Sequence, residues 1–194
     1  MLGLDASTAL IVVDLQNDFA DPAGSLYVRR GEETVVVANE HVERVLRVGG
    51  RVFYTQDWHP ERTPHFQTDG GIWPVHCVRE TWGAELQAAL RVEGPVVRKG
   101  TNGEDGYSGF TMRVPTTVET RPTELDGLLQ SVAVERLIIL GLATDYCVRS
   151  TAIDAAALGY QTTVVRAGVR AVDLAAGDGE RAFEAMRGAG VTIV

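Results

Sequence analysis

The sequence predicts an α/β fold, a three-layer α/β/α sandwich around a roughly six-stranded parallel sheet. Short apolar runs rich in β-branched residues alternate along the chain with amphipathic segments, which is typical of a parallel sheet covered by helices on both faces. Hydrophobic residues make up 45% of the 194 positions, enough for a substantial core. Because neither a repeat nor a linker divides the chain, we expect residues 1–194 to form a single domain.

The first part of the chain predicts two strands, one helix and a long loop. Residues 9–13 (Ala-Leu-Ile-Val-Val) are a continuous apolar run typical of a buried strand. Residues 33–48 carry apolar side chains at helical spacing among charges, and Gly49-Gly50 predicts the end of that helix. Residues 51–55 form the next strand. The irregular region at 56–82 is long for a plain connection, and such loops are usually functional or disordered.

The rest of the chain continues the alternation. Gly, Thr and Pro predict a loop at residues 102–121. Thr123 is a candidate helix N-cap, and Asp126 three residues later gives a partial capping box. In order, the predicted elements are a helix at 83–90, a strand at 95–98, a helix at 123–132, the most apolar strand at 136–140, a helix at 144–158, a strand at 161–165, a helix at 178–187 and a strand at 191–194.

The composition argues against several functional classes. The formal charge is −8, from 18 basic and 26 acidic residues, and no basic run appears, which argues against a nucleic-acid or anionic-membrane surface. No apolar run approaches membrane-spanning length. Cys77 and Cys147 are too few for a disulfide framework, and we interpret them as free thiols in a reducing compartment. The N-terminus lacks a basic segment before an apolar core, so we expect no signal peptide and a cytoplasmic location.

Four reactive side chains come just after four predicted strands. Asp14, Asp57 and Lys99 each lie within two residues of the end of a strand, and Cys147 begins the helix that follows another strand. The carboxyl ends of parallel strands share one edge of a sheet, and ligands bind at that edge. These residues are therefore predicted to form one site, provided that their strands are neighbours.

Cys147 is the candidate nucleophile. In the first turn of a helix, unpaired backbone N–H groups and the helix dipole lower the pKa of a thiol and can also bind an oxyanion. Lys99 would lower that pKa further, and Asp14 could accept the thiol proton. The alternatives are that Cys147 is a small buried side chain, that Asp14 is a turn or cap residue and that Lys99 is solvated.

Three of the four histidines fall in one loop together with an aspartate. Asp57, His59, His65 and His76 offer one carboxylate and three imidazoles, a mixed ligand set for a divalent transition metal such as Zn, Fe or Mn. The spacing of Asp57 and His59 lets both side chains point the same way from an extended segment. The alternative is that the loop histidines are structural. His41, the remaining histidine, is expected on a helix surface.

Aromatic residues lie close in sequence to these polar groups. An aromatic slot would suit a flat ring, and the alternative is ordinary core and loop packing, which we prefer for Trp82. Cys77 adjoins His76, and we expect it to serve packing, with a ligand role as the alternative. The aromatic residues in question are Phe19, Trp58, Phe66, Trp73 and Trp82.

Together these residues resemble the nicotinamidase/pyrazinamidase family of the isochorismatase-like hydrolase superfamily, over nearly the whole chain. Each motif is moderately specific, and the presence of five in the same order makes the resemblance highly specific. The five are Val-Val-Asp-Leu-Gln-Asn-Asp-Phe at 12–19, the metal region with Asp57-Trp-His59, His65 and Trp-Pro-Val-His-Cys-Val at 73–78, Arg98-Lys99-Gly100, Asp-Gly-Tyr-Ser-Gly-Phe at 105–110 and Gly-Leu-Ala-Thr-Asp-Tyr-Cys-Val at 141–148.

The resemblance implies an isochorismatase-like fold and an amidohydrolase that converts nicotinamide to nicotinate and ammonia through a cysteine thioester, as in NAD salvage, and that also accepts pyrazinamide. It implies that Asp14, Lys99 and Cys147 are the catalytic set. It also implies a cis peptide between Leu142 and Ala143, with backbone N–H groups turned toward an oxyanion.

The resemblance further implies how metal and substrate are held. One divalent ion would be bound by Asp57, His59, His65 and His76, and would orient the pyridine ring. Phe19 and Trp73 would flank that ring, and Tyr107 lies in a loop near the pocket and would contact the substrate. The family also implies a homo-oligomer with a small-molecule substrate. The charge and the lack of a long apolar run already argue against a nucleic-acid or a membrane partner.

Two rival interpretations stay open, and one position departs from the family. Tyr146 stands where some members have histidine, so the contact made at that place is not carried over. One rival keeps Cys147, Asp14 and Lys99 but acts on another small amide, a ureido compound or an isochorismate-like ether. The other is a non-catalytic metal-binding or interaction protein on the same fold.

Overall fold

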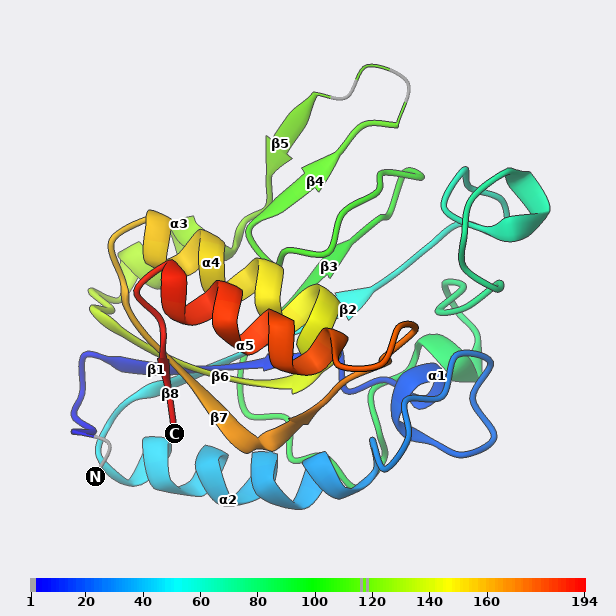
Figure 1. The fold of residues 1–194 in the computed structure, drawn as a ribbon. Coiled ribbons are helices and arrows are strands. Elements are labelled where there is room, and N and C mark those ends of the chain that lie inside the picture. The colour runs from blue at the N-terminus through cyan, green and yellow to red at the C-terminus, as the bar shows by residue number, and fades with distance from the viewer. Residues whose placement is uncertain (1–2, 116, 118) are drawn as a thin grey trace.

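The structure, a computed structural model, describes residues 3–115, 117 and 119–194. A six-stranded sheet lies between two layers of helices (Figure 1). Its strand order is β3-β2-β1-β6-β7-β8, and every pairing is parallel. The predicted fold class is therefore confirmed. The strands are β1 (Thr8–Val13), β2 (Arg51–Asp57), β3 (Val96–Lys99), β6 (Arg136–Leu142), β7 (Gln161–Arg170) and β8 (Thr192–Ile193).

Helices cover both faces of the sheet. Helix α2 lies on one face, and α3, α4 and α5 lie on the other (Figure 1). These helices are α2 (Glu33–Arg47), α3 (Leu125–Ser131), α4 (Arg149–Ala157) and α5 (Asp178–Gly188). Within the described residues, no helix is both long enough and apolar enough to cross a membrane.

The central strand β1 is buried along its whole length. Because helices cover both faces of a parallel sheet, a central strand has no face toward water and forms a continuous apolar run rather than an alternating one. From β1 the chain proceeds to β2 and β3 on one side, and β6, β7 and β8 lie on the other side. The strand order thus reverses between β1 and β6, which is where α/β sheets bind ligands.

Short elements complete the fold. The antiparallel hairpin of β4 and β5 extends from the body of the protein (Figure 1). Except for Pro122, the two strands lie within residues 102–121, which we predicted to be only a loop. Positions 116 and 118 of that stretch are outside the described residues. The short elements are α1 (Asn17–Ala20), the 3₁₀ turns η1 (Gln67–Asp69) and η2 (Trp82–Ala84), the π-helical turn η3 (Thr144–Val148), β4 (Thr111–Arg113) and β5 (Thr120–Pro122).

The helix predicted at 83–90 is wrong, because only the 3₁₀ turn η2 forms there. Tertiary hydrogen bonds compete with the helix. The N–H of Asn17 donates to the carbonyl of Glu85 at 2.9 Å, and that of Gln87 donates to the carbonyl of Leu15 at 2.8 Å. The segment therefore pairs with the chain that follows β1, and its backbone groups are satisfied without a helix.

Two other helices begin differently from the prediction. The helix expected at 144–158 starts as the π-helical turn η3 and becomes α-helical only at Arg149. Helix α3 begins at Leu125, whose N–H donates to the Thr123 hydroxyl at 3.2 Å. Asp126 does not complete a capping box, because its carboxylate accepts hydrogen bonds from Gln130 and Tyr160 instead.

His41 is buried in the packed face of α2, so the expectation of a surface histidine is wrong. Only 6% of the residue is exposed, and its Nδ1 lies 2.9 Å from the Val37 carbonyl oxygen one turn earlier. That hydrogen bond satisfies one ring nitrogen within the helix, so less free energy is lost when the ring is buried. His41 is thus a structural residue, remote in sequence from the other three histidines.

Candidate active site

The four strands that end at or just before the four reactive side chains are adjacent, in the order β3-β2-β1-β6. Asp57 and Lys99 are direct partners across β2 and β3. Asp14 immediately follows β1, and Cys147 lies in η3, just beyond β6. The condition set by the sequence is therefore met: these residues share one edge of the sheet.

Lys99 lies at the centre of this group. Its Nζ is 2.9 Å from Asp14 Oδ2, donates to Cys147 Sγ at 3.7 Å and contacts Asp57 Oδ1. All four residues are buried, with Lys99 only 1% exposed. The alternative of a solvated lysine is therefore wrong, and so is a turn-only role for Asp14. An ammonium, two carboxylates and a thiol therefore meet in one buried cluster.

The charges of this group compensate each other. Burial lowers the pKa of Lys99, but the negative charges of Asp14 and Asp57 have the larger combined effect. The pKa of Lys99 therefore lies well above its ordinary value. Burial raises the pKa of Asp57, and the attraction of Lys99 outweighs it, so the net pKa is well below normal. For Asp14 burial is the larger effect, and its pKa is raised despite Lys99. A carboxylate with a raised pKa is suited to accept a proton.

The thiol of Cys147 is protonated in the resting site. Burial raises the pKa of Cys147 well above its ordinary value, and the favourable charge of Lys99 only partly offsets this effect. The low pKa that the sequence predicted is therefore wrong. That prediction considered the helix terminus and Lys99, but it had no measure of burial, which disfavours the thiolate.

Two buried side chains that the sequence analysis did not single out hold the carboxylates in place. The Thr55 hydroxyl donates to Asp14 Oδ1 at 2.6 Å. The Gln16 amide bonds both sides of the Asp57 backbone, accepting from its N–H at 2.8 Å and donating to its carbonyl at 2.7 Å. The only sequence signal for Gln16 was its place two residues after Asp14 in the first motif.

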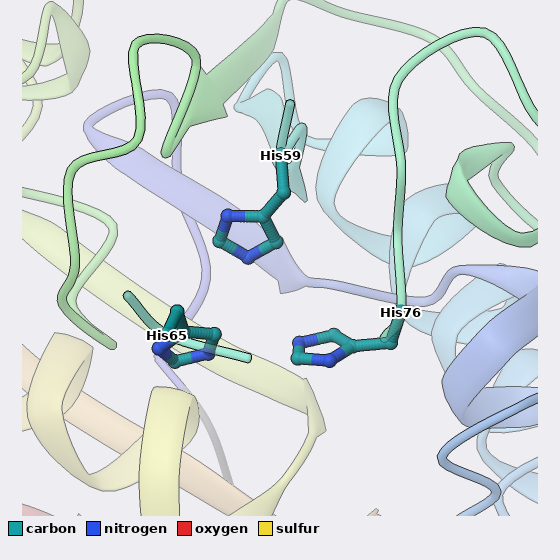
Figure 2. Close-up of side chains that lie close together, drawn as sticks. All are labelled: His59, His65 and His76. Atoms are coloured by element: carbon teal, nitrogen blue, oxygen red, sulfur yellow. The ribbon is translucent and has the colours of Figure 1, made fainter. Parts of the chain in front are cut away.

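His59, His65 and His76 converge beside this group. Each offers one ring nitrogen, and these atoms lie within 4.8 Å of one another. Figure 2 shows the three rings turned toward a common space. Each residue is no more than 8% exposed. We call these three residues the histidine trio.

Asp57 lies between the histidine trio and Lys99. Its Oδ2 is 3.7 Å from His59 Nε2, while its Oδ1 contacts Lys99. Of the four predicted metal ligands, three therefore converge as a trio, and the fourth adjoins them through one carboxylate oxygen.

The chemistry of the histidine trio fits a transition metal. Both ring nitrogens of His59 are buried without a hydrogen-bond partner among the described residues, and an unpaired buried polar atom is costly unless something binds it. Burial lowers the pKa of His76 to about 4, so its imidazole is neutral, as a ligand must be. A Cβ at Gly100 would lie 2.6 Å from His59 Nδ1, so the close approach of this ring requires glycine.

A pocket adjoins both groups. Cys147, Asp57 and two of the histidines, His65 and His76, line it. Trp73 Nε1 donates to the Tyr107 hydroxyl at 3.0 Å, and Tyr146 packs edge-on against Trp73 with the ring centroids 4.8 Å apart. The residues that line it are Phe19, Leu26, Val28, Asp57, His65, Trp73, His76, Tyr107, Ala143, Tyr146, Cys147 and Val172.

The remaining residues singled out from the sequence lie as follows. Trp58 packs under the Arg98 guanidinium, 3.8 Å from its ring centroid, and Phe66 is fully buried beside the histidine trio. Trp82 does not line the pocket, so it is not part of an aromatic slot, as preferred; it is 49% exposed and therefore not a core residue either. Cys77 is a buried free thiol in the core, as expected.

The peptide bond between Leu142 and Ala143 is cis. It joins the end of β6 to η3. Ala143 lines the pocket beside Cys147.

An isochorismatase domain model matches residues 8–194 of the chain. This protein belongs to the isochorismatase family. The matched range contains every site residue described above, from Asp14 to Cys147.

Within the isochorismatase family the similarity extends to particular proteins. The nicotinamidase of Escherichia coli is 37% identical over 203 residues, which cover 95% of this chain and 93% of that protein. The crystal structure of a pyrazinamidase from Pyrococcus horikoshii in complex with zinc is 38% identical, with a TM-score of 0.86 and coverage of 97% and 98%. PnC1 from L. infantum in complex with nicotinate is 34% identical, with a TM-score of 0.89 and coverage of 98% and 94%.

Proposed function

We propose that this protein is a metal-dependent amidohydrolase that converts nicotinamide to nicotinate and ammonia. One observation carries the proposal: a single buried ammonium, Lys99, lies 2.9 Å from the Asp14 carboxylate and 3.7 Å from the Cys147 thiol, beside three convergent imidazoles. The similarity to nicotinamidases over nearly the full length of the chain supports the choice of substrate. A non-catalytic binding protein would have no use for the thiol, base and ammonium together.

The first half of the reaction forms a thioester. Sγ of Cys147 attacks the carboxamide carbon while its proton moves to Asp14, whose raised pKa suits that role. Backbone N–H groups of Ala143 and Cys147 hold the oxyanion. Asp14 returns the proton to the amide nitrogen, the C–N bond breaks and ammonia leaves.

The second half hydrolyses the thioester. Asp14 accepts a proton from water as the hydroxide oxygen bonds to the acyl carbon. The C–S bond then breaks, Asp14 returns the proton to sulfur, and the product leaves as nicotinic acid, which loses its carboxyl proton to solvent and becomes nicotinate. Lys99, whose own pKa is held well above its ordinary value, keeps Asp57 charged and partly offsets the effect of burial on the pKa of Asp14. The earlier expectation that Lys99 also keeps Cys147 charged does not fit the raised pKa of that thiol.

Asp57, His59, His65 and His76 would hold one divalent ion of zinc, iron or manganese. When bound, such an ion supplies a Lewis-acidic position that fixes the pyridine nitrogen, so that its part is mainly orientation. The zinc complex of the similar pyrazinamidase supports zinc among the three. Phe19, Trp73 and Tyr107 would enclose the ring, and the same pocket would accept pyrazinamide. A role in NAD salvage and homo-oligomeric assembly follow from the sequence resemblance alone, and a cytoplasmic location follows from the N-terminal sequence and the two free cysteines alone.

Ammonia release from nicotinamide by the purified protein, with and without added zinc, tests the proposal. We expect turnover with nicotinamide and pyrazinamide. A panel of other small amides and ureido compounds tests the rival interpretation, in which the same catalytic residues act on a different substrate. Ammonia release from one of these compounds and none from nicotinamide would support that rival, with Cys147, Asp14 and Lys99 in the same roles.

A further inference from the structure

Asp105 lies behind one member of the histidine trio. Its Oδ1 is 2.8 Å from His65 Nδ1, although the two residues are 40 positions apart and belong to different loops. Asp105 does not line the pocket. The hydrogen bond takes up Nδ1 of the ring, so Nε2 is the nitrogen of His65 that is left to bind a metal ion.

The Asp105 carboxylate is itself held in place. Its backbone forms two hydrogen bonds with Arg113 in β4: the Asp105 N–H donates to the Arg113 carbonyl at 2.7 Å, and the Arg113 N–H donates back at 2.5 Å. The Gly106 N–H donates to Oδ1 at 2.8 Å, and the Arg113 guanidinium contacts Oδ2. The acceptor is thus positioned by the base of the β4–β5 hairpin, independently of any ligand.

The trio members differ in what their second nitrogen contacts. His76 Nδ1 lies 2.7 Å from the Pro74 carbonyl oxygen, and neither nitrogen of His59 has a partner among the described residues. Within that part of the chain, His65 is the trio member whose ring bonds a carboxylate. A carboxylate that accepts a hydrogen bond from Nδ1–H fixes the tautomer and orients the ring. It also makes Nε2 more basic and therefore a stronger ligand for a metal ion.

We propose that Asp105 is a positioning residue for the metal centre, and that it acts through His65. This inference rests on the metal centre proposed above and deepens it, because it assigns metal affinity to a residue that touches neither ion nor substrate. The expected consequence is that loss of the carboxylate weakens metal binding about 10–100-fold while the fold is retained.

The experiment measures zinc affinity by competition with a chromophoric chelator, and the melting temperature of the zinc-free protein, for the wild type and three variants. Asp105→Ala should bind zinc about 10–100-fold more weakly. Asp105→Asn, whose amide oxygen still accepts a hydrogen bond, should fall between Ala and the wild type. Arg113→Met is the matched control: it removes the partner of Oδ2 and leaves His65 untouched, so its affinity should stay within about fivefold.

The cobalt-loaded proteins give a second readout. The d–d absorption of bound cobalt reports ligand geometry, and it should change in Asp105→Ala but not in Arg113→Met. Should Asp105→Ala fail to fold, the Asn variant decides: weaker zinc binding at an unchanged melting temperature supports the role, and unchanged zinc binding overturns it.

The outcomes separate this inference from the proposed function. Zinc binding by the wild type together with equal binding by Asp105→Ala overturns the role of Asp105 and leaves the metal centre standing. Equal losses in Asp105→Ala and Arg113→Met, with lower melting temperatures in both, also overturn it, because loop packing would then explain the effect. No zinc binding by the wild type overturns the metal centre and this inference together.

Discussion

The two halves of the site differ in how their buried polar atoms are satisfied. Around Lys99, opposite charges compensate each other within the protein. In the histidine trio, neutral rings converge, and both nitrogens of His59 lack a partner among the described residues. Buried charges are stable only when paired, and buried polar atoms only when bonded. Asp14 Oδ2 in the Lys99 group also makes no hydrogen bond among the described residues, but it lies 2.9 Å from the Lys99 ammonium, so its charge is compensated within the protein. The trio, in contrast, has donor capacity that an added cation would use.

The largest effect should come from removing the thiol. Cys147→Ala should lower kcat by a factor of at least about 10⁴, because removal of a nucleophile eliminates the covalent route, while the melting temperature changes little. Cys77→Ala is the matched control, since Cys77 is the other free thiol and lies in the core; it should retain turnover. Near-wild-type activity of Cys147→Ala, measured by ammonia release, would refute covalent catalysis.

The second-largest effect tests how much the buried charge pairs of Lys99 stabilise the folded protein. Lys99→Met leaves two buried carboxylates without their counter-charge, which should reduce the free energy of unfolding by about 3–5 kcal/mol. Arg98→Met removes an exposed cation one residue earlier and should cost less than about 1 kcal/mol. Urea unfolding of the metal-free proteins measures both. Similar losses in the two variants would mean that the Lys99 charges are not specially coupled.

Metal removal should affect the histidine trio and, through it, substrate binding. Chelation should raise KM for nicotinamide more than it lowers kcat, because the proposed role of the ion is to anchor the ring. Adding zinc to 100 times its Kd should in turn stabilise the protein by about 2.7 kcal/mol. Steady-state kinetics and thermal unfolding measure the two effects. Equal substrate affinity before and after chelation contradicts the anchoring role.

The smallest effect concerns the pH dependence of the free thiol. A raised folded-state pKa means that the neutral thiol persists past the ordinary pKa of cysteine and that the thiolate appears only as the pH rises further. The iodoacetamide alkylation rate of Cys147, followed by mass spectrometry, should increase about tenfold per pH unit between pH 7 and 9. A plateau below pH 7 would show a resting thiolate and would restore the prediction made from the sequence.

The sequence predicted the parts of the site that depend on strand ends and motifs. Asp14, Asp57 and Lys99 follow apolar runs, so a parallel sheet brings them to one edge whatever the details of packing. Burial was not predictable in the same way, which is why the pKa of Cys147 was predicted with the wrong sign and His41 was placed on a surface.

Contacts between distant loops were also beyond local patterns. Nothing in the spacing of Asp105 and His65 indicates that they meet, because the pairing depends on a hairpin that the Gly- and Pro-containing stretch did not predict. The segment at 83–90 has helical periodicity, but its backbone bonds to the chain after β1. In both cases tertiary hydrogen bonds override the local signal.

Asp57 has one oxygen beside the histidine trio and the other beside Lys99. Its replacement should therefore have consequences that replacement of a histidine does not have. Loss of one histidine from the trio should weaken zinc binding, and a higher zinc concentration can then restore part of the zinc occupancy by mass action. Replacing Asp57 would also deprive Lys99 of one of its two carboxylates, and no dose of metal can supply that missing negative charge. Zinc supplementation should therefore restore the variants of the histidine trio in part and leave the Asp57 variant unrestored, which would single out Asp57 among the four proposed ligands.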